Sequence, residues 1–314
     1  MHRNGVSCRQ LILWLSTALL APILLQAGKY SLWSMAVMAV SAAVLVLTVY
    51  RYGATCNGRV FRWIQALWLV VISGILTGQT NELWPEAKDF PVVPLALLTV
   101  AALSALGETD GTAQVNAIVF WIVAVLLLCV ITAGIPAVDM ERVSLQPTTV
   151  QISHWWLFLI PALAVFLPTI PKSRGGAFLP FAILLFSVWT EGILTVDLCR
   201  REAWPFYEAS KSVRISAVAD RLEPLVSICV TIGYYSIYSL LLTIITNLIG
   251  KNSSGRRKTV VLGFCVIASL VIGKWLVIPG VMVSMISLLL RIIAPVVYGI
   301  FDKQKKYQKN ENNT

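Results

Sequence analysis

Three ionisable side chains fall inside long apolar stretches of the sequence, at Glu191, Asp197 and Arg291. A charge near the centre of a bilayer costs about 2.5–3.5 kcal/mol on insertion scales, so such residues often mark ion or proton paths or buried pairs. Glu191 is therefore a candidate proton or cation site, or else the partner of a cation, either Arg200 or Arg291. We favour a paired or snorkelling role for Arg291. Asp197 lies near the expected end of its helix, where a carboxylate can reach water.

A second group able to do chemistry is the hydroxyl-rich run at 233–239. Tyr234 and Tyr238 are one helical turn apart, and Tyr235 and Ser239 share the adjacent face of the same helix. Hydroxyls with aromatic walls are suited to lining a cavity for a small molecule. Tyrosine also packs at membrane interfaces and hydrogen-bonds between membrane helices, so packing is at least as well supported for any one of these residues.

Prolines gather in a third stretch, at Pro161, Pro168 and Pro171, which is followed by the basic, glycine-containing run 172–176. Two interpretations fit equally well. A helix broken inside the membrane would free backbone groups that contact substrate or ions in transporters. Alternatively, Pro168 and Pro171 simply end an ordinary helix.

The elements that position these residues are predicted to be membrane-spanning helices. Crossing the hydrocarbon core takes roughly 20 mostly apolar residues, and stretches of that kind recur along the whole chain. Dividing them at proline, glycine and charge predicts ten spans, at about 10–26, 32–50, 60–77, 90–106, 114–135, 154–170, 178–198, 225–248, 260–278 and 281–301. The first span is expected to be a retained helix rather than a cleaved signal peptide.

Composition agrees with a single helical bundle in a membrane. Of the 314 residues, 57% are hydrophobic and only 13% are charged, whereas soluble domains carry about 25% charged residues. The net charge of +10 comes from basic residues in short connecting segments, which indicates membrane orientation and not nucleic-acid binding. Their distribution places both termini in the cytoplasm.

Catalytic and metal-binding patterns are missing from the sequence. The six cysteines are scattered without a paired spacing, and there are only two histidines. A zinc site, a disulfide framework or a histidine-based triad is therefore not expected. With no nucleotide-binding loop, nucleophile motif or paired carboxylates, we predict that the chain is not an enzyme and uses no cofactor or metal.

The longest polar segment carries a more specific pattern. Residues 204–215 read WPFYEASKSVRI, and residues 220–225 read DRLEPL. This closely resembles the aromatic-Pro-Phe-x-Glu…Arg…Glu-Arg-hydrophobic-Glu pattern of the endospore germination permease family. Weaker matches are SCRQL at 7–11 and LWPE at 83–86. The residues that match the loop motif are Pro205, Phe206, Glu208, Arg214, Arg221 and Glu223.

We also predict how this segment is structured. The resemblance implies a charged framework of Glu208, Arg214 and Arg221. The apolar residues Val213 and Leu222 begin and end a helically spaced series, which predicts a short amphipathic helix on the membrane surface or a cap on the bundle.

The resemblance implies a particular architecture. The family comprises the B subunits of spore germinant receptors and belongs to the amino acid/polyamine/organocation transporter superfamily. It implies a LeuT-like five-plus-five inverted repeat, with repeat one at about 10–135, repeat two at about 154–301 and a basic cytoplasmic tail at 302–314. The first and sixth helices would be broken around a small-molecule site. Analogy places this ligand-binding site between the first, third, sixth and eighth helices, with candidate lining residues Thr17, Trp68, Phe166, Thr169, Tyr234 and Tyr238.

The implied function is sensing of a small nutrient such as an amino acid, together with receptor A and C subunits, in the lipid of the spore inner membrane or cell membrane. Two departures matter. The sixth span reads PALAVFLP at 161–168, without the family's usual Gly-Glu, and the first has Pro22 but none of the usual glycines. A secondary amino-acid transporter and a scaffold subunit that binds no ligand therefore stay as alternatives.

Overall fold

The computed structural model describes residues 6–54, 58–84, 91–144, 154–167, 175–213, 222–250 and 255–311. Within these ranges every regular element is a helix. The first seven elements are α1 (Cys8–Gln26), α2 (Leu32–Tyr52), α3 (Arg59–Leu83), α4 (Val92–Leu106), α5 (Thr109–Gly134) and the 3₁₀ turns η2 (Ile135–Ala137) and η3 (Met140–Arg142). Then come α6 (Trp155–Phe158), η5 (Ile160–Phe166), η6 (Gly175–Phe181), α7 (Ala182–Ile193), α8 (Val196–Arg201) and α9 (Pro205–Ser212). The last are α10 (Glu223–Gly250), α11 (Gly255–Trp275), α12 (Gly280–Leu288), the π-helical η7 (Leu289–Ile293) and α13 (Ala294–Glu311).

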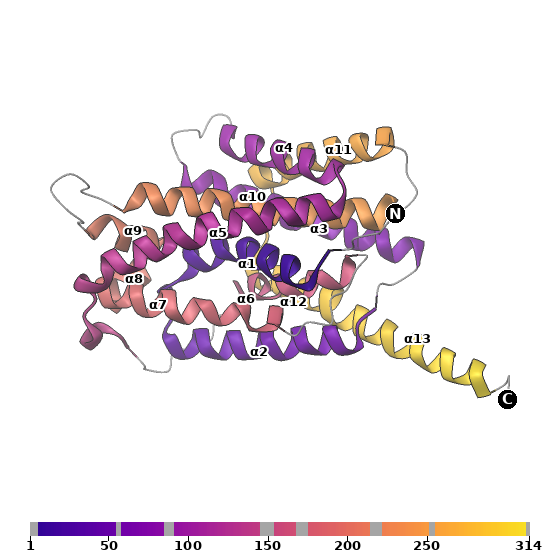
Figure 1. The fold of residues 1–314 in the computed structure, drawn as a ribbon, viewed down its shortest axis with the longest axis horizontal. Helices are drawn as coiled ribbons and strands as arrows, with labels where there is room; N and C mark the ends of the chain where they lie inside the picture. The colour runs from indigo at the N-terminus through magenta and orange to yellow at the C-terminus, as the bar shows by residue number, and fades with distance from the viewer. Residues whose placement is uncertain are drawn as a thin grey trace.

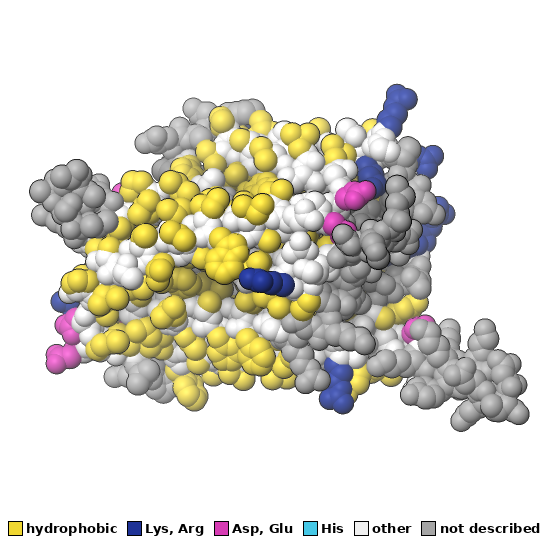
Figure 2. Space-filling view, viewed as in Figure 1, with side chains coloured by type: hydrophobic (Ala, Val, Ile, Leu, Met, Phe, Trp, Pro, Cys, Tyr) yellow, Lys and Arg dark blue, Asp and Glu magenta, His cyan; other side chains and the backbone are white. Residues whose placement is uncertain are grey.

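The chain is an all-α, multi-pass membrane protein. Eight helices of the described residues are long and apolar enough to cross a membrane, and α4 is a shorter apolar helix. The helices run along the long axis of the bundle, and α1 begins and α13 ends toward the same end (Figure 1). Hydrophobic side chains cover the middle of the face in Figure 2, and most charged side chains there lie toward the two ends. Side chains such as Trp275 and Val277, 77% and 95% exposed, suit lipid contact.

Helix α10 forms the centre of the bundle. In its most apolar window 78% of the residues are buried, against 22% for α5 and for α11. It packs against α1, α3, α4 and α5. Two backbones come close where Gly233 of α10 faces Ala21 of α1, because a Cβ on Gly233 would lie 2.7 Å from the Ala21 nitrogen. Small residues at helix contacts are how membrane helices gain van der Waals packing without a hydrophobic driving force.

Two serines define the starts of the first two helices. Ser7 Oγ accepts a hydrogen bond from Gln10 N at 3.2 Å, and Gln10 Oε1 accepts one from Ser7 N at 2.9 Å, which is a complete capping box. Ser31 Oγ accepts a hydrogen bond from Ser34 N at the start of α2. Both caps satisfy amide groups that have no partner within the helix.

The predicted span at 154–170 is not one α-helix. It consists of the four-residue α6 and the 3₁₀ segment η5, and residues 168–170 lie outside the described residues. Pro161 lacks an amide hydrogen, and its ring would clash with the Leu157 carbonyl in a continuing α-helix, which explains the break after Phe158. Leu167 is extended, with ψ 148°, as expected for a residue that precedes a proline.

The seventh span is shorter than predicted at its carboxyl end. Helix α7 ends at Ile193, and Leu194 is extended with ψ 149°. Asp197 therefore lies outside the span, in the first turn of the separate helix α8. The long polar segment that follows, 199–224, contains α9, whose bounds overlap the motif at 204–215.

Candidate functional site

A hydroxyl cluster joins α3 to α10 in the core. The Tyr238 hydroxyl lies 3.2 Å from Thr77 Oγ1 and 3.1 Å from Thr80 Oγ1. Both threonines donate to carbonyls of their own helix, of Ser73 at 2.8 Å and of Leu76 at 2.7 Å. The Thr oxygens are thereby left as acceptors, and a single Tyr238 proton is available to the two of them.

Tyr234 extends this cluster by one turn. Its ring stacks on that of Tyr238, with centroids 6.1 Å apart and planes 29° apart. The side chain is fully buried, and its hydroxyl lies near Thr80 without a hydrogen bond of good geometry. A buried hydroxyl without a well-formed hydrogen bond carries a desolvation cost that a polar ligand group would relieve.

The neighbouring faces of α10 bind other helices. Ser239 Oγ accepts hydrogen bonds from Trp14 Nε1 of α1 at 3.2 Å and from Asn116 Nδ2 of α5 at 3.3 Å. The Tyr235 hydroxyl lies 2.8 Å from Ser104 Oγ of α4. The run at 233–239 therefore links α10 to four helices, and two of its buried hydroxyls, those of Tyr234 and Ser236, have no well-formed hydrogen bond among the described residues.

The other predicted lining residues lie elsewhere in the bundle. Trp68 Nε1 donates to Ser287 Oγ of α12 at 3.3 Å. Phe166 is buried in η5, and Thr17 donates to the Leu13 carbonyl on α1. Thr169 lies outside the described residues. Of the six candidates, Tyr234 and Tyr238 share one site, and the structure adds Thr77 and Thr80 to it.

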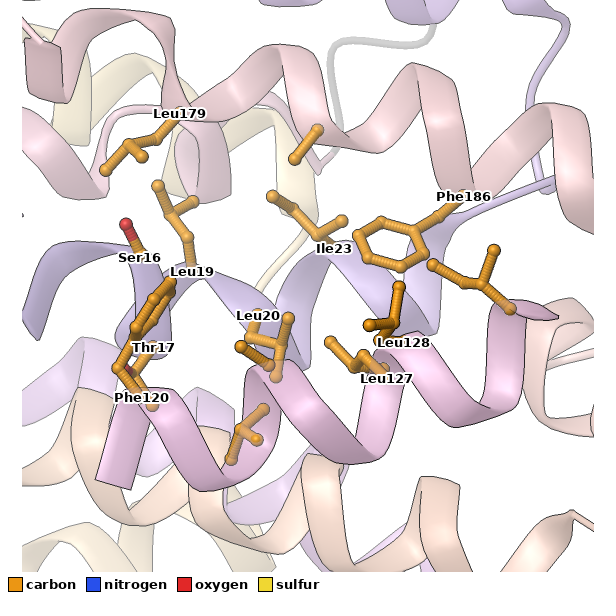
Figure 3. A pocket seen from close by; sticks show the side chains of 14 residues that line it. Ser16, Thr17, Leu19, Leu20, Ile23, Phe120, Leu127, Leu128, Leu179 and Phe186 are labelled. Atoms are coloured by element: carbon orange, nitrogen blue, oxygen red, sulfur yellow. The ribbon is translucent and has the colours of Figure 1, made fainter. Parts of the chain in front are cut away.

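Thr17 instead borders an apolar groove between α1, α5, η6 and α7, with a volume of about 330 Å³. Figure 3 shows Ser16 and Thr17 toward one end and Phe186 toward the other, with leucines between them. Leu128 in its wall is 62% exposed, so the groove opens on the lipid-facing side. Its chemistry suits hydrocarbon and not a polar nutrient.

Glu191 lies at the carboxyl end of α7, where it is 1% exposed. Its Oε2 accepts a hydrogen bond from Ser144 N at 3.3 Å, and no described residue hydrogen-bonds to Oε1. Arg142 Nη1 also donates to the Ile193 carbonyl, so the segment around η3 covers this end of α7. In the part of the chain that the structure describes, no ion pair joins Glu191 to Arg200 or Arg291.

Arg291 is buried within the bundle, not extended toward an interface, so the snorkelling interpretation is wrong. The side chain is 1% exposed and lies in η7. Nη1 donates to the Trp156 carbonyl of α6 at 3.3 Å, and no described residue accepts from Nε or Nη2. Single-turn π-helical segments within α-helices are frequent at functional sites.

The long polar segment packs on the bundle through Phe206, the aromatic residue of its motif. Pro205 begins α9, and the ring of Phe206 contacts those of Phe186 and Trp189, at centroid distances of 5.6 and 4.8 Å. Phe206 is fully buried. The segment is therefore anchored to α7.

Two charged motif residues have partners that the sequence did not identify. Glu208 pairs with Lys211 at 2.8 Å, and this hydrogen bond raises the pKa of Lys211. Glu223 Oε1 accepts from the Tyr207 hydroxyl at 2.6 Å. Burial and then this bond to Glu223 raise the pKa of Tyr207.

The predicted framework and amphipathic helix can be followed only in part. Arg214 and Arg221 lie outside the described residues, as does most of the stretch between Val213 and Leu222. Helix α9 ends at Ser212, and Leu222 N donates to the Ser210 carbonyl at 3.3 Å. Leu222 therefore lies beside the last turn of α9.

Comparison with protein-family profiles and with curated protein sequences gives no match to this chain. The fold and the apolar surface define the chain as an integral, multi-pass, all-α membrane protein. Two places in its core hold polar groups able to bind a ligand. One is the α3–α10 hydroxyl cluster, and the other is the surroundings of Arg291, nearer the amino end of α3.

Proposed function

We propose that this protein is the membrane subunit of a spore germinant receptor, which binds a small nutrient such as an amino acid and passes a conformational signal to A and C subunits. The observation that carries the proposal is the interruption of the sixth span in the buried core. Between Phe158 and Leu167 the chain leaves α-helical geometry while its side chains stay at most 4% exposed. In membrane transporters, helices broken in this way supply backbone groups to the substrate.

The surroundings of the break support a ligand site. Segment η5 contacts α1 and α10, and α10 contacts α3. In a LeuT-like five-plus-five repeat, with halves at about 10–135 and 154–301, the sixth span is the counterpart of the first, and α10 is the counterpart of α3. The Tyr234–Tyr238 face would then offer hydroxyls to the polar groups of a nutrient, with Thr77 and Thr80 as partners.

The long polar segment at 199–224 supports the receptor subunit over the other candidate functions. Its motif matches the germination permease pattern, and its Phe206, Glu208 and Glu223 all make specific contacts. The proposed location is the spore inner membrane with both termini in the cytoplasm. For a signal to exist, the nutrient must bind one conformation more tightly than the other.

Germination of spores of the host tests this function. Spores that lack the chain are expected to lose their response to one class of nutrient and to regain it on complementation. Complementation with Tyr238→Phe should raise the nutrient concentration for half-maximal response about two- to tenfold, which corresponds to one hydrogen bond of about 0.5–1.5 kcal/mol. Tyr298→Phe, at a tyrosine outside this cluster, is the matched control. Unchanged responses of the deletion spores to every nutrient would contradict the proposal.

A secondary transporter for amino acids is the second candidate, and the unpartnered Oε1 of Glu191 is the observation that favours it. A carboxylate at the carboxyl end of α7 is able to exchange a proton during transport. Uptake of radiolabelled amino acids into proteoliposomes separates the two, because a receptor subunit has no need to move its ligand across the membrane. The absent Gly-Glu in the sixth span keeps a scaffold role as a third alternative, for which neither nutrient binding nor uptake is expected.

A further inference from the structure

Arg291 is a charged side chain with no charged partner among the described residues, and water does not reach it. It is 1% exposed, and its hydrogen bond to the Trp156 carbonyl involves one of its three nitrogens. Taking a guanidinium out of water costs several kcal/mol, which is offset only when the remaining donors are satisfied. A group with opposite charge would therefore be stabilised strongly at this place.

The two guanidinium nitrogens that lack an acceptor indicate the chemical class of this group. Nη1 is occupied by Trp156, whereas no described residue accepts from Nε or Nη2. Nε and Nη2 form one edge of the planar guanidinium, with two nearly parallel N–H donors. This edge matches the two oxygens of a carboxylate, which it binds through two parallel charge-assisted hydrogen bonds.

Side chains and backbone groups around η7 make hydrogen bonds of their own. Trp156 N donates to Ser284 Oγ at 3.4 Å, Trp68 Nε1 donates to Ser287 Oγ, and Gln65 Nε2 donates to the Leu290 carbonyl at 3.3 Å. These bonds connect α3, α6 and α12 around η7. These three donors already have acceptors, and Gln65 Oε1 is an acceptor nearby that has no hydrogen-bond partner among the described residues.

We propose that Arg291 is the binding residue for the carboxylate of a small-molecule ligand, held by the Nε–Nη2 edge between α3, α6 and η7. The proposal rests on the proposed function, because it gives the nutrient's chemical class as a carboxylic acid. It also names a contact that the resemblance did not, since Arg291 lies on the tenth predicted span and not among the first, third, sixth and eighth.

An apolar groove lies beside Trp156, the residue whose carbonyl bonds to Arg291. A cavity of about 250 Å³ lies between α2, α6 and α12, and its lining includes Ser41, Trp155, Ser284 and Leu288. Trp155 adjoins Trp156, and Ser284 bonds to the Trp156 amide. Because Arg291 is 1% exposed, a ligand reaches it only if an adjoining element such as the four-residue α6 moves.

Propionate tests the site without knowledge of the nutrient, because it is little more than a carboxylate. The purified protein is heated in detergent with potassium propionate, with propionamide, which has the same shape and no charge, or with potassium chloride at equal ionic strength. We expect propionate alone to raise the apparent Tm of the wild type by about 2 °C or more. The rise should vanish in Arg291→Met and persist in Arg256→Met, which removes an exposed arginine of α11.

Arg291→Met is expected to remain folded, because replacing an unpaired buried charge with an apolar side chain of similar length is often neutral or stabilising. Should it aggregate on size exclusion, Arg291→Lys decides the matter, since lysine keeps the charge without the two-donor edge. A full propionate shift in either variant, an equal shift with propionamide, or no shift in folded wild type would overturn the carboxylate site. Binding of an uncharged nutrient would leave the proposed function standing while the Arg291 proposal fails.

Discussion

Replacing Gly233 with alanine is expected to destabilise the protein by about 1–3 kcal/mol, the usual cost of overpacking a well-packed core. The added Cβ would lie 2.7 Å from both the nitrogen and the Cβ of Ala21. A backbone nitrogen in the middle of α1 cannot move aside as a flexible side chain can. The central α1–α10 contact must therefore open, and this contact also contains the Trp14–Ser239 hydrogen bond.

Gly263→Ala is the matched control for this change. A Cβ at Gly263 meets nothing within 4 Å, and alanine is favoured over glycine inside a helix by about 1 kcal/mol. The apparent Tm in detergent should fall for Gly233→Ala and stay the same or rise for Gly263→Ala. Equal Tm values for the two variants would show that α1 and α10 do not approach each other at Gly233.

Trp14→Ala should be still more damaging, at about 3–5 kcal/mol, as is typical for deletion of a buried aromatic side chain. Trp14 is fully buried, and its Nε1 lies 3.3 Å from the Ser236 carbonyl and 3.2 Å from Ser239 Oγ. The substitution leaves a cavity between α1 and α10 and removes a donor from both of these oxygens. We expect little monodisperse protein after extraction from the membrane.

Trp121→Ala provides the comparison. Trp121 of α5 is 54% exposed on the outside of the bundle, where loss of its ring removes lipid contact and little packing. Its yield and size-exclusion profile should match the wild type. If Trp14→Ala and Trp121→Ala behaved alike, α1 would not be a core helix.

The sequence was sufficient to predict the membrane class and the positions of most spans, because both follow from the length and apolarity of local stretches. The boundary errors have local causes as well. Pro161 converts the sixth span from α-helix to 3₁₀ geometry, and the extended Leu194 separates Asp197 from α7. Hydropathy averages over windows too long to register a break at a single residue.

The composition of the candidate sites was less predictable, because it depends on pairs far apart in the chain. Helical spacing correctly put Tyr234 and Tyr238 on one face of a helix, but nothing in the sequence indicated that this face would meet Thr77, 161 residues before Tyr238. Likewise the bond between Ser144 and Glu191 crosses 47 residues. The sequence identified Arg291 as unusual, because a charge inside a membrane is costly. Which of its nitrogens lack an acceptor is known only from the contacts in the structure.

The most direct test of a nutrient-binding core is ligand-dependent thermal stability of the purified protein, measured with a panel of amino acids, sugars and nucleosides on the wild type and on Tyr238→Phe. A ligand that binds the folded state raises its apparent stability. The account predicts that one class, the amino acids, raises the Tm of the wild type and that a higher concentration is needed for the same rise in Tyr238→Phe. A well-folded sample that responds to no member of the panel, or a response that Tyr238→Phe leaves unchanged, would contradict ligand binding at the α3–α10 cluster.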